Sequence, residues 1–307
     1  MSIIERAAAK IGTPKKDQER SDPISDPEQT LGVLPGMDVR ELTPAQEDPK
    51  AGHFLHPDLS GYQEIDLEAL ASKGFCTPNE PRSAQALEFR RIKRPLLLNI
   101  RKSTLLDAYA KRPNLIMVTS ALPNEGKTFV AINLAVSIAA ELDKHVILVD
   151  GDVAKGDVTG VLGIDYQMGL SELLTEETRL TDDLILHTNI EHLSVLPSGK
   201  PNAHIDELYA SEVMRGIVDE LAENDPDRVI IFDAPPLLAT TEAGVLSNLM
   251  GQVVMVVEAD KTPQSAVKDA LAHLDETENV SMVLNKTSHK SGDVYGYGYG
   301  YGYTSTE

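Results

Sequence analysis

Residues 120–128 carry the residue types and spacing of a phosphate-binding loop. They read Ser-Ala-Leu-Pro-Asn-Glu-Gly-Lys-Thr, and the Walker A pattern is Gly, four residues, then Gly-Lys-Ser/Thr. Ala121 stands where the first glycine is usual, whereas Gly126, Lys127 and Thr128 match the pattern. The preceding apolar run favours this interpretation over a chance Gly-Lys-Thr at a helix start. The expected cofactor-binding residues are those of the loop and of the helix that follows it: Pro123, Asn124, Glu125, Gly126, Lys127, Thr128 and Phe129.

Acidic residues follow two other apolar runs. Asp150 and Asp152 come directly after residues 146–149, and Asp233 follows a later run and precedes Ala-Pro-Pro. In a parallel sheet the carboxyl ends of strands form the edge where ligands bind. An aspartate after a strand is more often a turn or cap residue, but the loop and these two sites together disfavour that alternative. We therefore predict that Thr128, Asp152 and Asp233 hold Mg²⁺, the carboxylates directly or through water.

Apolar segments that alternate with helical ones must position these residues. Continuous apolar runs, expected as buried strands, lie at 115–118, 146–149, 193–196, 229–232, 253–257 and 280–284. Segments with helical periodicity lie between them, for example at 129–142, 212–222 and 263–274. This alternation predicts an α/β fold of the P-loop NTPase kind, a mostly parallel sheet with helices on both faces.

The composition excludes several classes of protein. The chain has 307 residues, of which 48 are acidic and 28 basic, so its formal net charge is −20. This excess of acid argues against a nucleic-acid partner and against direct docking on anionic lipid. The single cysteine, Cys76, excludes an internal disulfide framework and fits a reducing cytosol. No apolar run approaches the roughly 20 residues that a membrane-spanning helix needs.

Together, these motifs resemble those of the bacterial tyrosine kinases. Residues 120–128, Ile-Leu-Val-Asp-Gly-Asp at 147–152 and Val-Ile-Ile-Phe-Asp-Ala-Pro-Pro at 229–236 are similar to that family's Walker A, A′ and B motifs. Two further features of the family are an E-x-x-R-x-x-R oligomerisation motif, matched by Glu88, Arg91 and Arg94, and an autophosphorylated tyrosine cluster, which the Tyr-Gly repeat at 295–303 resembles. Residues 88–97, 152–155 and 284–287 look most like the subgroup encoded with exosortase-type exopolysaccharide systems.

The resemblance implies an ATP-dependent protein-tyrosine autokinase that regulates exopolysaccharide or capsule polymerisation or export. Lys127, Asp150 and Asp152 are then the expected catalytic residues. Asp150 is the candidate acceptor of the tyrosine proton, although a role at Mg²⁺ is equally open for it. Asn285 resembles the position that reads the adenine edge in related ATPases, and its alternative is a strand-terminal cap. The expected phosphoacceptors are the five tyrosines of the repeat: Tyr295, Tyr297, Tyr299, Tyr301 and Tyr303.

Composition and the resemblance together predict three domains, and the resemblance implies several partners. Residues 1–80 are expected as a largely disordered, acidic, proline-rich segment with a helical turn at 67–71, residues 81–290 as the kinase domain, and residues 291–307 as a flexible tail. The expected partners are further copies of the chain in a homo-oligomer, for which a ring is one option, a separate transmembrane activator or chain-length-determinant protein, and a protein-tyrosine phosphatase. The expected location is the cytoplasm, with recruitment to the inner face of the membrane. Pro95 is expected to end the helix that carries Arg91 and Arg94 or to start the next segment.

Some features depart from the family's pattern or leave alternatives open. Ala154 stands where the A′ motif usually has Arg, and Lys155, which follows it, lacks Arg's planar fork. A deviant-Walker ATPase that positions proteins on membranes or DNA usually has an extra lysine early in the loop, whereas this chain has Ser-Ala-Leu at 120–122. A nonenzymatic nucleotide-dependent assembly switch, with an adhesive rather than phosphorylated tail, is the other alternative.

Overall fold

The computed structural model describes residues 61–106, 112–166, 168–175, 184–202, 204–223, 227–275 and 279–288. The predictions of a disordered segment before residue 61 and of a flexible tail at 291–307 concern residues outside these ranges. The five tail tyrosines and Tyr109 also lie outside them.

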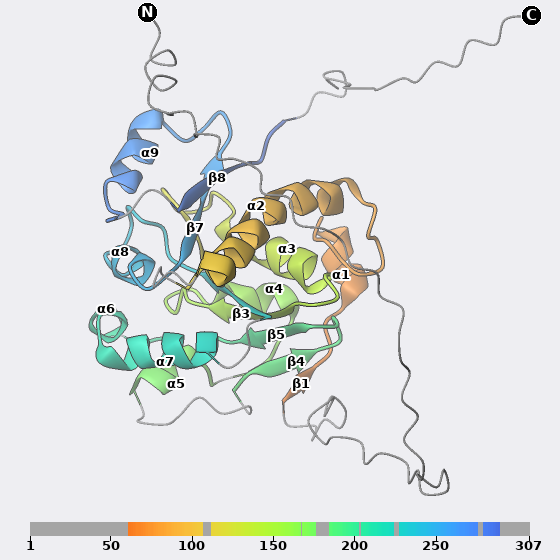
Figure 1. Cartoon of the computed structure of the whole chain (residues 1–307), viewed down its shortest axis with the longest axis horizontal. Coiled ribbons are helices and arrows are strands. Elements are labelled where there is room, and N and C mark those ends of the chain that lie inside the picture. Colours follow the sequence, from red (N-terminus) through yellow and green to blue (C-terminus); the bar gives the residue numbers. More distant parts are fainter. Residues whose placement is uncertain are drawn as a thin grey trace, which may run out of the picture. The chain divides into compact units, whose positions relative to one another are not determined.

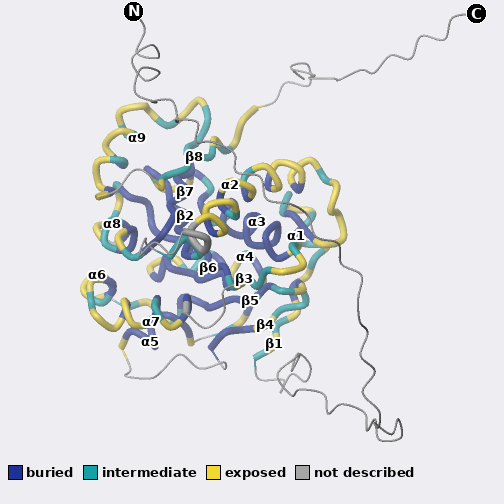
Figure 2. Tube along the Cα trace, in the orientation of Figure 1, coloured by how far each residue is buried: buried dark blue, intermediate teal, exposed yellow. Residues whose placement is uncertain are grey.

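An eight-stranded sheet forms the centre of the described part (Figures 1 and 2), in the order β1-β4-β5-β3-β6-β2-β7-β8. Every neighbouring pair is parallel except β4 and β5. The six strands predicted from apolar runs are confirmed, whereas the short β1 and β4 were not predicted. The bounds are β1 Tyr62–Gln63, β2 Leu115–Ser120, β3 His145–Asp150, β4 Leu186–Thr188, β5 Leu193–Leu196, β6 Arg228–Asp233, β7 Gln252–Glu258 and β8 Val280–Asn285.

Helices cover both faces of the sheet, as predicted. The alternation of side chains along the strands produces two cores: on β2, Ile116 and Val118 belong to one, and Leu115 and Met117 to the other. The first core is completed by α1 Leu67–Ser72, α2 Ala84–Leu106, α3 Lys127–Ala139 and α4 Asp157–Leu162. The second is completed by α5 Leu170–Thr175, α6 Ile205–Tyr209, α7 Glu212–Glu223, α8 Glu242–Ser247 and α9 Gln264–Leu271.

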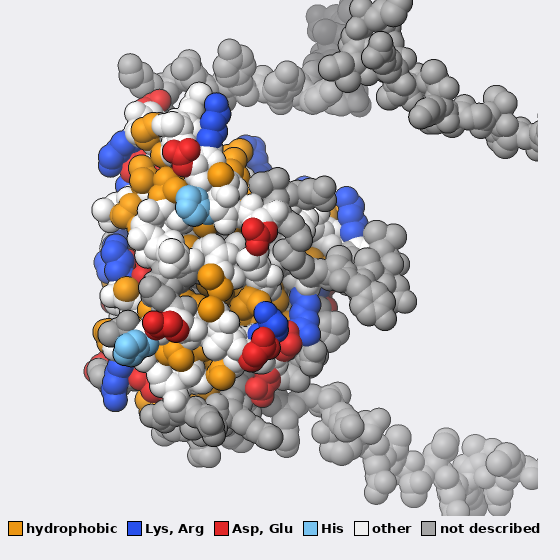
Figure 3. Space-filling view, turned by 90° about the vertical axis from the view of Figure 1, so that its left-hand side faces the viewer, with side chains coloured by type: hydrophobic (Ala, Val, Ile, Leu, Met, Phe, Trp, Pro, Cys, Tyr) orange, Lys and Arg blue, Asp and Glu red, His pale blue; other side chains and the backbone are white. Residues whose placement is uncertain are grey.

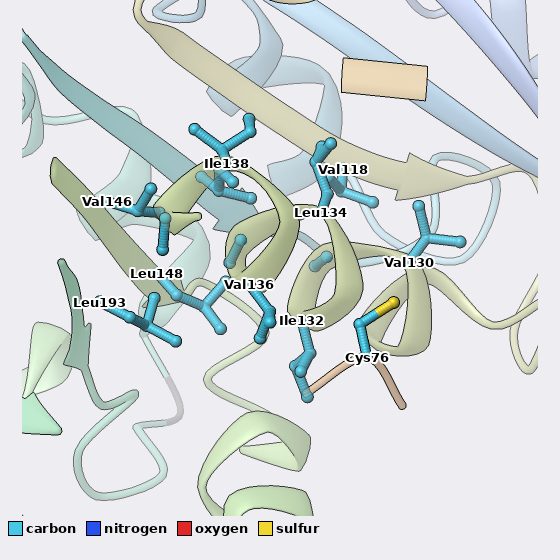
Figure 4. Packing of buried hydrophobic residues seen from close by; sticks show 14 of the residues in the cluster. Cys76, Val118, Val130, Ile132, Leu134, Val136, Ile138, Val146, Leu148 and Leu193 are labelled. Atoms are coloured by element: carbon cyan, nitrogen blue, oxygen red, sulfur yellow. The ribbon is translucent and has the colours of Figure 1, made fainter. Parts of the chain in front are cut away.

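Helix α3, which follows the phosphate-binding loop, lies almost wholly inside the first core. Its side chains are apolar around most of the helix, as a buried helix requires. Figure 4 shows Leu134 and Ile138 of this helix beside Val118 of β2 and Val146 of β3. Figure 2 shows that the central strands are buried, whereas outer helices such as α9 are largely exposed. The phosphate-binding loop thus connects a buried strand, β2, to a buried helix, α3.

The folded part begins earlier than the predicted boundary at residue 81. Strand β1 pairs with β4, and helix α1 confirms the helical turn predicted at 67–71. Ile65, Leu70 and Cys76 are buried in the first core, and the Cys76 N–H donates to Asn133 Oδ1 of α3 at 2.6 Å. Residues 61–80 thus pack on the sheet and on α3, so the described fold starts before residue 81. Strand β1 was not predicted, because two residues are too few to give a periodic pattern.

Helix α2 corrects a second prediction, because it continues through Pro95. A proline in a helix interior removes one backbone hydrogen bond and crowds the carbonyl four residues earlier. Here Pro95 lies on the exposed side, while Phe89, Leu96 and Ile100 are buried on the other side and pack in the first core. This packing holds the helix together across the proline. No helix within the described ranges is both long and apolar enough to cross a bilayer.

Candidate nucleotide and magnesium site

The three predicted motifs meet at the carboxyl ends of adjacent strands. Strand β6 lies between β2 and β3, so the A′ and B motifs become neighbours of the phosphate-binding loop. Asp150 of β3 lies directly opposite Asp233 of β6 in the register of the sheet. The Thr128 hydroxyl, in the first turn of α3, donates to Asp233 Oδ2 at 2.6 Å. The structure thus brings together residues that are more than 100 positions apart in the sequence.

The loop has the backbone form of an anion-binding site. Gly126 has φ 94° and Asn124 has φ 66°, both in the left-handed region. A Cβ atom at Gly126 would displace the Asn285 side chain and would hold a strained backbone conformation, so glycine suits this position. Helix α3 begins at Lys127 and has no side-chain N-cap. Its first N–H groups and the positive end of its dipole are therefore available to a phosphate.

Lys127 lies among the carboxylates that the sequence predicted. Its side chain is buried, and Nζ lies 2.8 Å from Asp152 Oδ2 and 3.7 Å from Asp233 Oδ1. Burial lowers the pKa of Lys127, but the charges of Asp233 and Asp152 outweigh it and raise the pKa above its ordinary value. The ammonium is therefore protonated at neutral pH and is the positive charge that offsets this acidic site.

The aspartates at the ends of β3 and β6 are fully buried, and burial disfavours the charged form of each carboxyl group. Burial, together with the charge of Asp233, raises the pKa of Asp150 to about 8. Burial also raises the pKa of Asp233 to about 6, against the opposing effects of Lys127 and the Thr128 hydroxyl. Asp150 Oδ1 has no hydrogen-bond partner, and the only partner of Asp152 Oδ2 and Asp233 Oδ1 within the described residues is the Lys127 ammonium. Buried carboxylate oxygens with so few donors are what a further cation would satisfy.

The oxygen atoms of this site suit Mg²⁺, which takes part of its ligands from water and phosphate, better than a metal ion bound by protein side chains alone. The described residues contain no group of three or more His, Cys, Asp or Glu side chains placed to hold a metal ion. Mg²⁺ in phosphate-transferring sites is usually bound by one or two carboxylates, several waters and the phosphates of the substrate. Asp152 and Asp233, with the Thr128 hydroxyl beside Asp233, match that arrangement.

Comparison with known proteins decides the family. An AAA domain model matches residues 116–287. The chain is 32% identical over 197 residues to tyrosine-protein kinase YwqD of Bacillus subtilis, and this match covers 63% of the chain and 78% of that kinase. The chain belongs to the bacterial tyrosine-kinase family.

Two further comparisons agree with this assignment. Tyrosine-protein kinase ptk of Acinetobacter johnsonii is 34% identical over 165 residues, a match that covers 54% of the chain but only 22% of that relative. The solved kinase domain of Escherichia coli tyrosine kinase ETK superposes with a TM-score of 0.53 at 26% identity, covering 66% of the chain and 80% of that domain. The resemblance and the P-loop fold expected from the sequence are thereby confirmed.

Within this family's loop, not every predicted cofactor residue can contribute its side chain. Phe129 packs on Phe75 and Phe89, with ring centroids 4.9 and 6.3 Å apart, so only its backbone can face a nucleotide. Pro123 and Asn124 are exposed at the tip of the loop. Glu125 turns its side chain into the protein.

Asn285, the predicted adenine reader, contacts the loop from the end of β8. Its side-chain Nδ2 donates to the Glu125 carbonyl at 2.9 Å, and the adjacent Lys286 Nζ donates to the Asn124 carbonyl at 2.6 Å. Asn285 therefore supports the loop in this structure, and its recognition of adenine stays a prediction. The contact of Lys286 was not predicted, because a lysine after a strand carries no signal of its own.

Sequence reasoning also missed an acidic neighbour of the site. Asp157 begins α4, and its charge acts on both Lys127 and Asp233. Lys155, considered as a substitute for the family's Arg, is about half exposed and lies 3.5 Å from the Asp157 carboxylate. Its ammonium thus lies beside an exposed carboxylate at the start of α4. The sequence signal for Asp157 is an acidic residue in the first turn of a helix that follows the A′ motif.

Proposed function

We propose that the chain is an ATP-dependent protein-tyrosine autokinase that phosphorylates its own C-terminal tyrosines. The observation that carries this proposal is the placement of Lys127 among Asp150, Asp152 and Asp233, beside an anion-binding loop. Phosphoryl transfer needs mainly positioning and charge stabilisation, and this site offers both. The membership of the tyrosine-kinase family supports the same conclusion.

ATP supplies the transferred group when bound, and Mg²⁺ neutralises part of its charge. Lys127 would offset γ-phosphate charge, and Thr128, Asp152 and Asp233 would hold the metal. Asp150 is the candidate acceptor of the tyrosine proton. Its free Oδ1 atom and a pKa raised by burial to about 8 suit a base that works near neutral pH.

The described residues also bear on the choice of phosphoacceptor. Tyr209 is buried, and its hydroxyl donates to the Gly151 carbonyl at 2.7 Å, so it is not available to a kinase in this fold. Strand β8 ends at Asn285, against the phosphate-binding loop. An extended chain reaches about 3.3–3.6 Å per residue, so a tail that starts there can reach its own site or a neighbour's. We propose the five tyrosines from Tyr295 to Tyr303 as the acceptors.

The proposal includes assembly into a homo-oligomer through α2. Glu88, Arg91 and Arg94 are exposed on this helix, whereas Lys93 is buried and forms an ion pair with Glu141 at 2.6 Å. The first three side chains are thus accessible to another copy of the chain, and Lys93 is part of the fold. A head-to-tail contact of this kind closes a ring if its rotation permits.

The remaining parts of the proposal concern the cellular setting. We propose regulation of exopolysaccharide or capsule polymerisation or export as the role. A separate transmembrane activator would recruit the kinase from the cytoplasm to the inner face of the membrane, and a phosphatase would reset it. These parts are supported by the resemblance of residues 88–97, 152–155 and 284–287 to the exopolysaccharide-associated subgroup.

The test is incubation of the purified full chain with labelled ATP and Mg²⁺, followed by mapping of the phosphorylated residues. A variant with all five tail tyrosines changed to Phe is compared with the wild type. An autokinase labels the wild type on the tail, and the variant binds ATP but loses most label. ATP hydrolysis without phosphotyrosine indicates a positioning ATPase, and nucleotide binding without either reaction indicates an assembly switch. A five-Phe variant that keeps most of its phosphotyrosine overturns the tail as the substrate.

A further inference from the structure

The Glu125 side chain has a place in the phosphate-binding loop that the proposed chemistry does not use. It is only 2% exposed and turns into the protein. Its Oε2 atom accepts the Leu122 N–H at 2.7 Å, which closes the loop on itself. Its Oε1 atom accepts the Glu258 N–H at 3.3 Å and the Thr262 hydroxyl. The carboxylate therefore has three donors and joins two distant parts of the chain.

The segment that Glu125 reaches is itself a closed turn. Residues 258–262 connect β7 to α9, and the Thr262 N–H donates to the Glu258 carbonyl at 3.2 Å. The Thr262 hydroxyl also accepts the Glu258 N–H at 3.2 Å. Lys286 adds a second connection, since its Nζ lies 3.2 Å from Glu258 Oε2 and donates to the Asn124 carbonyl. The phosphate-binding loop is thus fastened to the β7–α9 turn at two points.

The geometry points to Glu125 as a positioning residue of the nucleotide site, and this inference rests on the proposed function. Its carboxylate clamps the phosphate-binding loop to the turn at 258–262 and so sets the direction of the loop N–H groups that meet phosphate. Asn124 and Gly126 have positive φ values, and such a conformation persists only where its surroundings enforce it. An N–H cradle that is already in place binds its anion without a cost of reordering.

The chemistry of the clamp requires a carboxylate. A carboxylate only accepts hydrogen bonds, so it can serve the Leu122 N–H, the Glu258 N–H and the Thr262 hydroxyl together. A glutamine would turn its amide NH₂ toward one of these donors and lose that contact. An alanine would leave all three donors without this partner in a partly buried place, which costs more than losing a fully exposed hydrogen bond.

The experiment measures the Kd of a fluorescent ADP analogue with Mg²⁺, using the full chain and its variants Glu125→Ala, Glu125→Gln and Thr262→Val. The matched control is Glu172→Gln. Glu172 is a comparably buried carboxylate, 7% exposed, that accepts the Gly169 N–H at 2.8 Å and the Lys200 N–H at 3.2 Å. It has the same kind of role in a different loop, without contact to the phosphate-binding loop.

We expect Glu125→Ala to raise the Kd about tenfold or more, which corresponds to about 1.4 kcal/mol. Glu125→Gln and Thr262→Val raise it by smaller factors, and their double variant raises it by less than the product, since both remove the same contact. Glu172→Gln leaves the Kd within about twofold of the wild type. The rise in melting temperature on adding ADP shrinks in the Glu125 and Thr262 variants but not in Glu172→Gln, whereas a merely structural loss lowers the melting temperature and leaves that rise intact.

Two results overturn the clamp while the proposed function stands. One is a Kd equal to that of the wild type in both Glu125→Gln and Thr262→Val. This result excludes the clamp even if Glu125→Ala does not fold. The other is an equal loss of affinity in Glu172→Gln, because the effect would then be general destabilisation. A wild-type chain that binds no nucleotide overturns the proposed function itself, and the clamp with it.

Discussion

Asp150 and Asp233 lie in an environment that disfavours their charge. Both are fully buried, each has a carboxylate oxygen without a hydrogen bond, and Lys127 is the cation beside them. Proteins tend to break the rules of stable packing at functional sites and to compensate elsewhere. At the scale of the residue, stability and activity should therefore respond in opposite directions when this charge is removed.

The pH dependence of the stability of Asp150→Asn tests this expectation directly. Because the pKa of Asp150 is raised by burial to about 8 from its ordinary value of 3.8, the folded chain holds a proton that the unfolded chain releases. This contribution to stability is fully present below pH about 4 and is lost as the pH rises towards 8. We expect the nucleotide-free variant to melt several degrees above the wild type at pH 8, with a smaller difference at pH 5, and to make no phosphotyrosine.

Thermal unfolding at both pH values checks the prediction. A loss of about 1 kcal/mol shifts the melting temperature by roughly 2–4 °C in a domain of this size. Asp157→Asn is the control, because the Asp157 side chain is 42% exposed. The same pH dependence in wild type and Asp150→Asn would contradict the assignment of a protonated, buried Asp150.

The sequence allowed the grouping of Lys127, Thr128 and the three aspartates to be predicted, because strand-end motifs in a parallel sheet converge at one edge. It did not reveal the clamp of Glu125 or the influence of Asp157. Whether a loop side chain faces the ligand or the protein depends on which segments lie beside the loop, and here those segments follow it by more than 130 positions.

At the scale of elements, long buried features were predictable and short or interrupted ones were not. The central strands are buried on both faces and so form continuous apolar runs. Strands β1 and β4 span two and three residues, too few for any pattern. Helix α2 was predicted to end at Pro95 because local propensity favours that end, whereas packing of Leu96 and Ile100 sustains the helix.

The continuation of α2 predicts that Pro95→Ala stabilises the protein. Proline in a helix interior is about 3 kcal/mol less favourable than alanine, and packing offsets rather than removes this cost. Because Pro95 is exposed, the replacement creates no cavity. We expect the melting temperature to rise by several degrees, as read by circular dichroism. Leu98→Ala, at a half-exposed position of the same helix, should shift it little. A lower melting temperature in Pro95→Ala would show that the proline is required by the fold.

At the scale of the molecule, charge is the dominant feature, with a net value of −20 over the chain. Figure 3 shows acidic, basic and apolar side chains interspersed on the face that it presents. Like-charged copies repel one another, so an assembly of this chain needs local attraction. The exposed arginines of α2 are the candidates for it.

The triple variant Glu88→Ala, Arg91→Ala, Arg94→Ala should shift the chain towards monomer in light scattering. It should also reduce phosphotyrosine if tails are modified by neighbouring copies. The double variant Arg101→Ala, Lys102→Ala removes exposed positive charge from the same helix and should leave the mass unchanged. A wild type that is monomeric at every concentration, or a triple variant of unchanged mass, would exclude this role for α2.

Phosphorylation should then drive the assembly apart. Each phosphate adds about −1.5 to −2 charges at pH 7, and exposed charges within about 8 Å are poorly screened at physiological ionic strength. We expect the unphosphorylated chain to assemble, the multiply phosphorylated chain to dissociate, and a phosphatase to restore assembly. Equal mass distributions for the two forms, measured by light scattering at the same salt concentration, would refute the charge-driven part of this cycle.

The most direct test of the account is the phosphotyrosine content of Lys127→Met after incubation with ATP and Mg²⁺. Lys127 is the cation that faces the carboxylates of the site, and its loss should remove transition-state stabilisation worth on the order of 10²-fold or more in rate. Lys200→Met, at an exposed lysine, is the matched control, and thermal unfolding confirms that both variants fold. The account predicts phosphotyrosine on the tail of the wild type and of Lys200→Met and almost none in Lys127→Met. Near-wild-type phosphotyrosine in a folded Lys127→Met would contradict it.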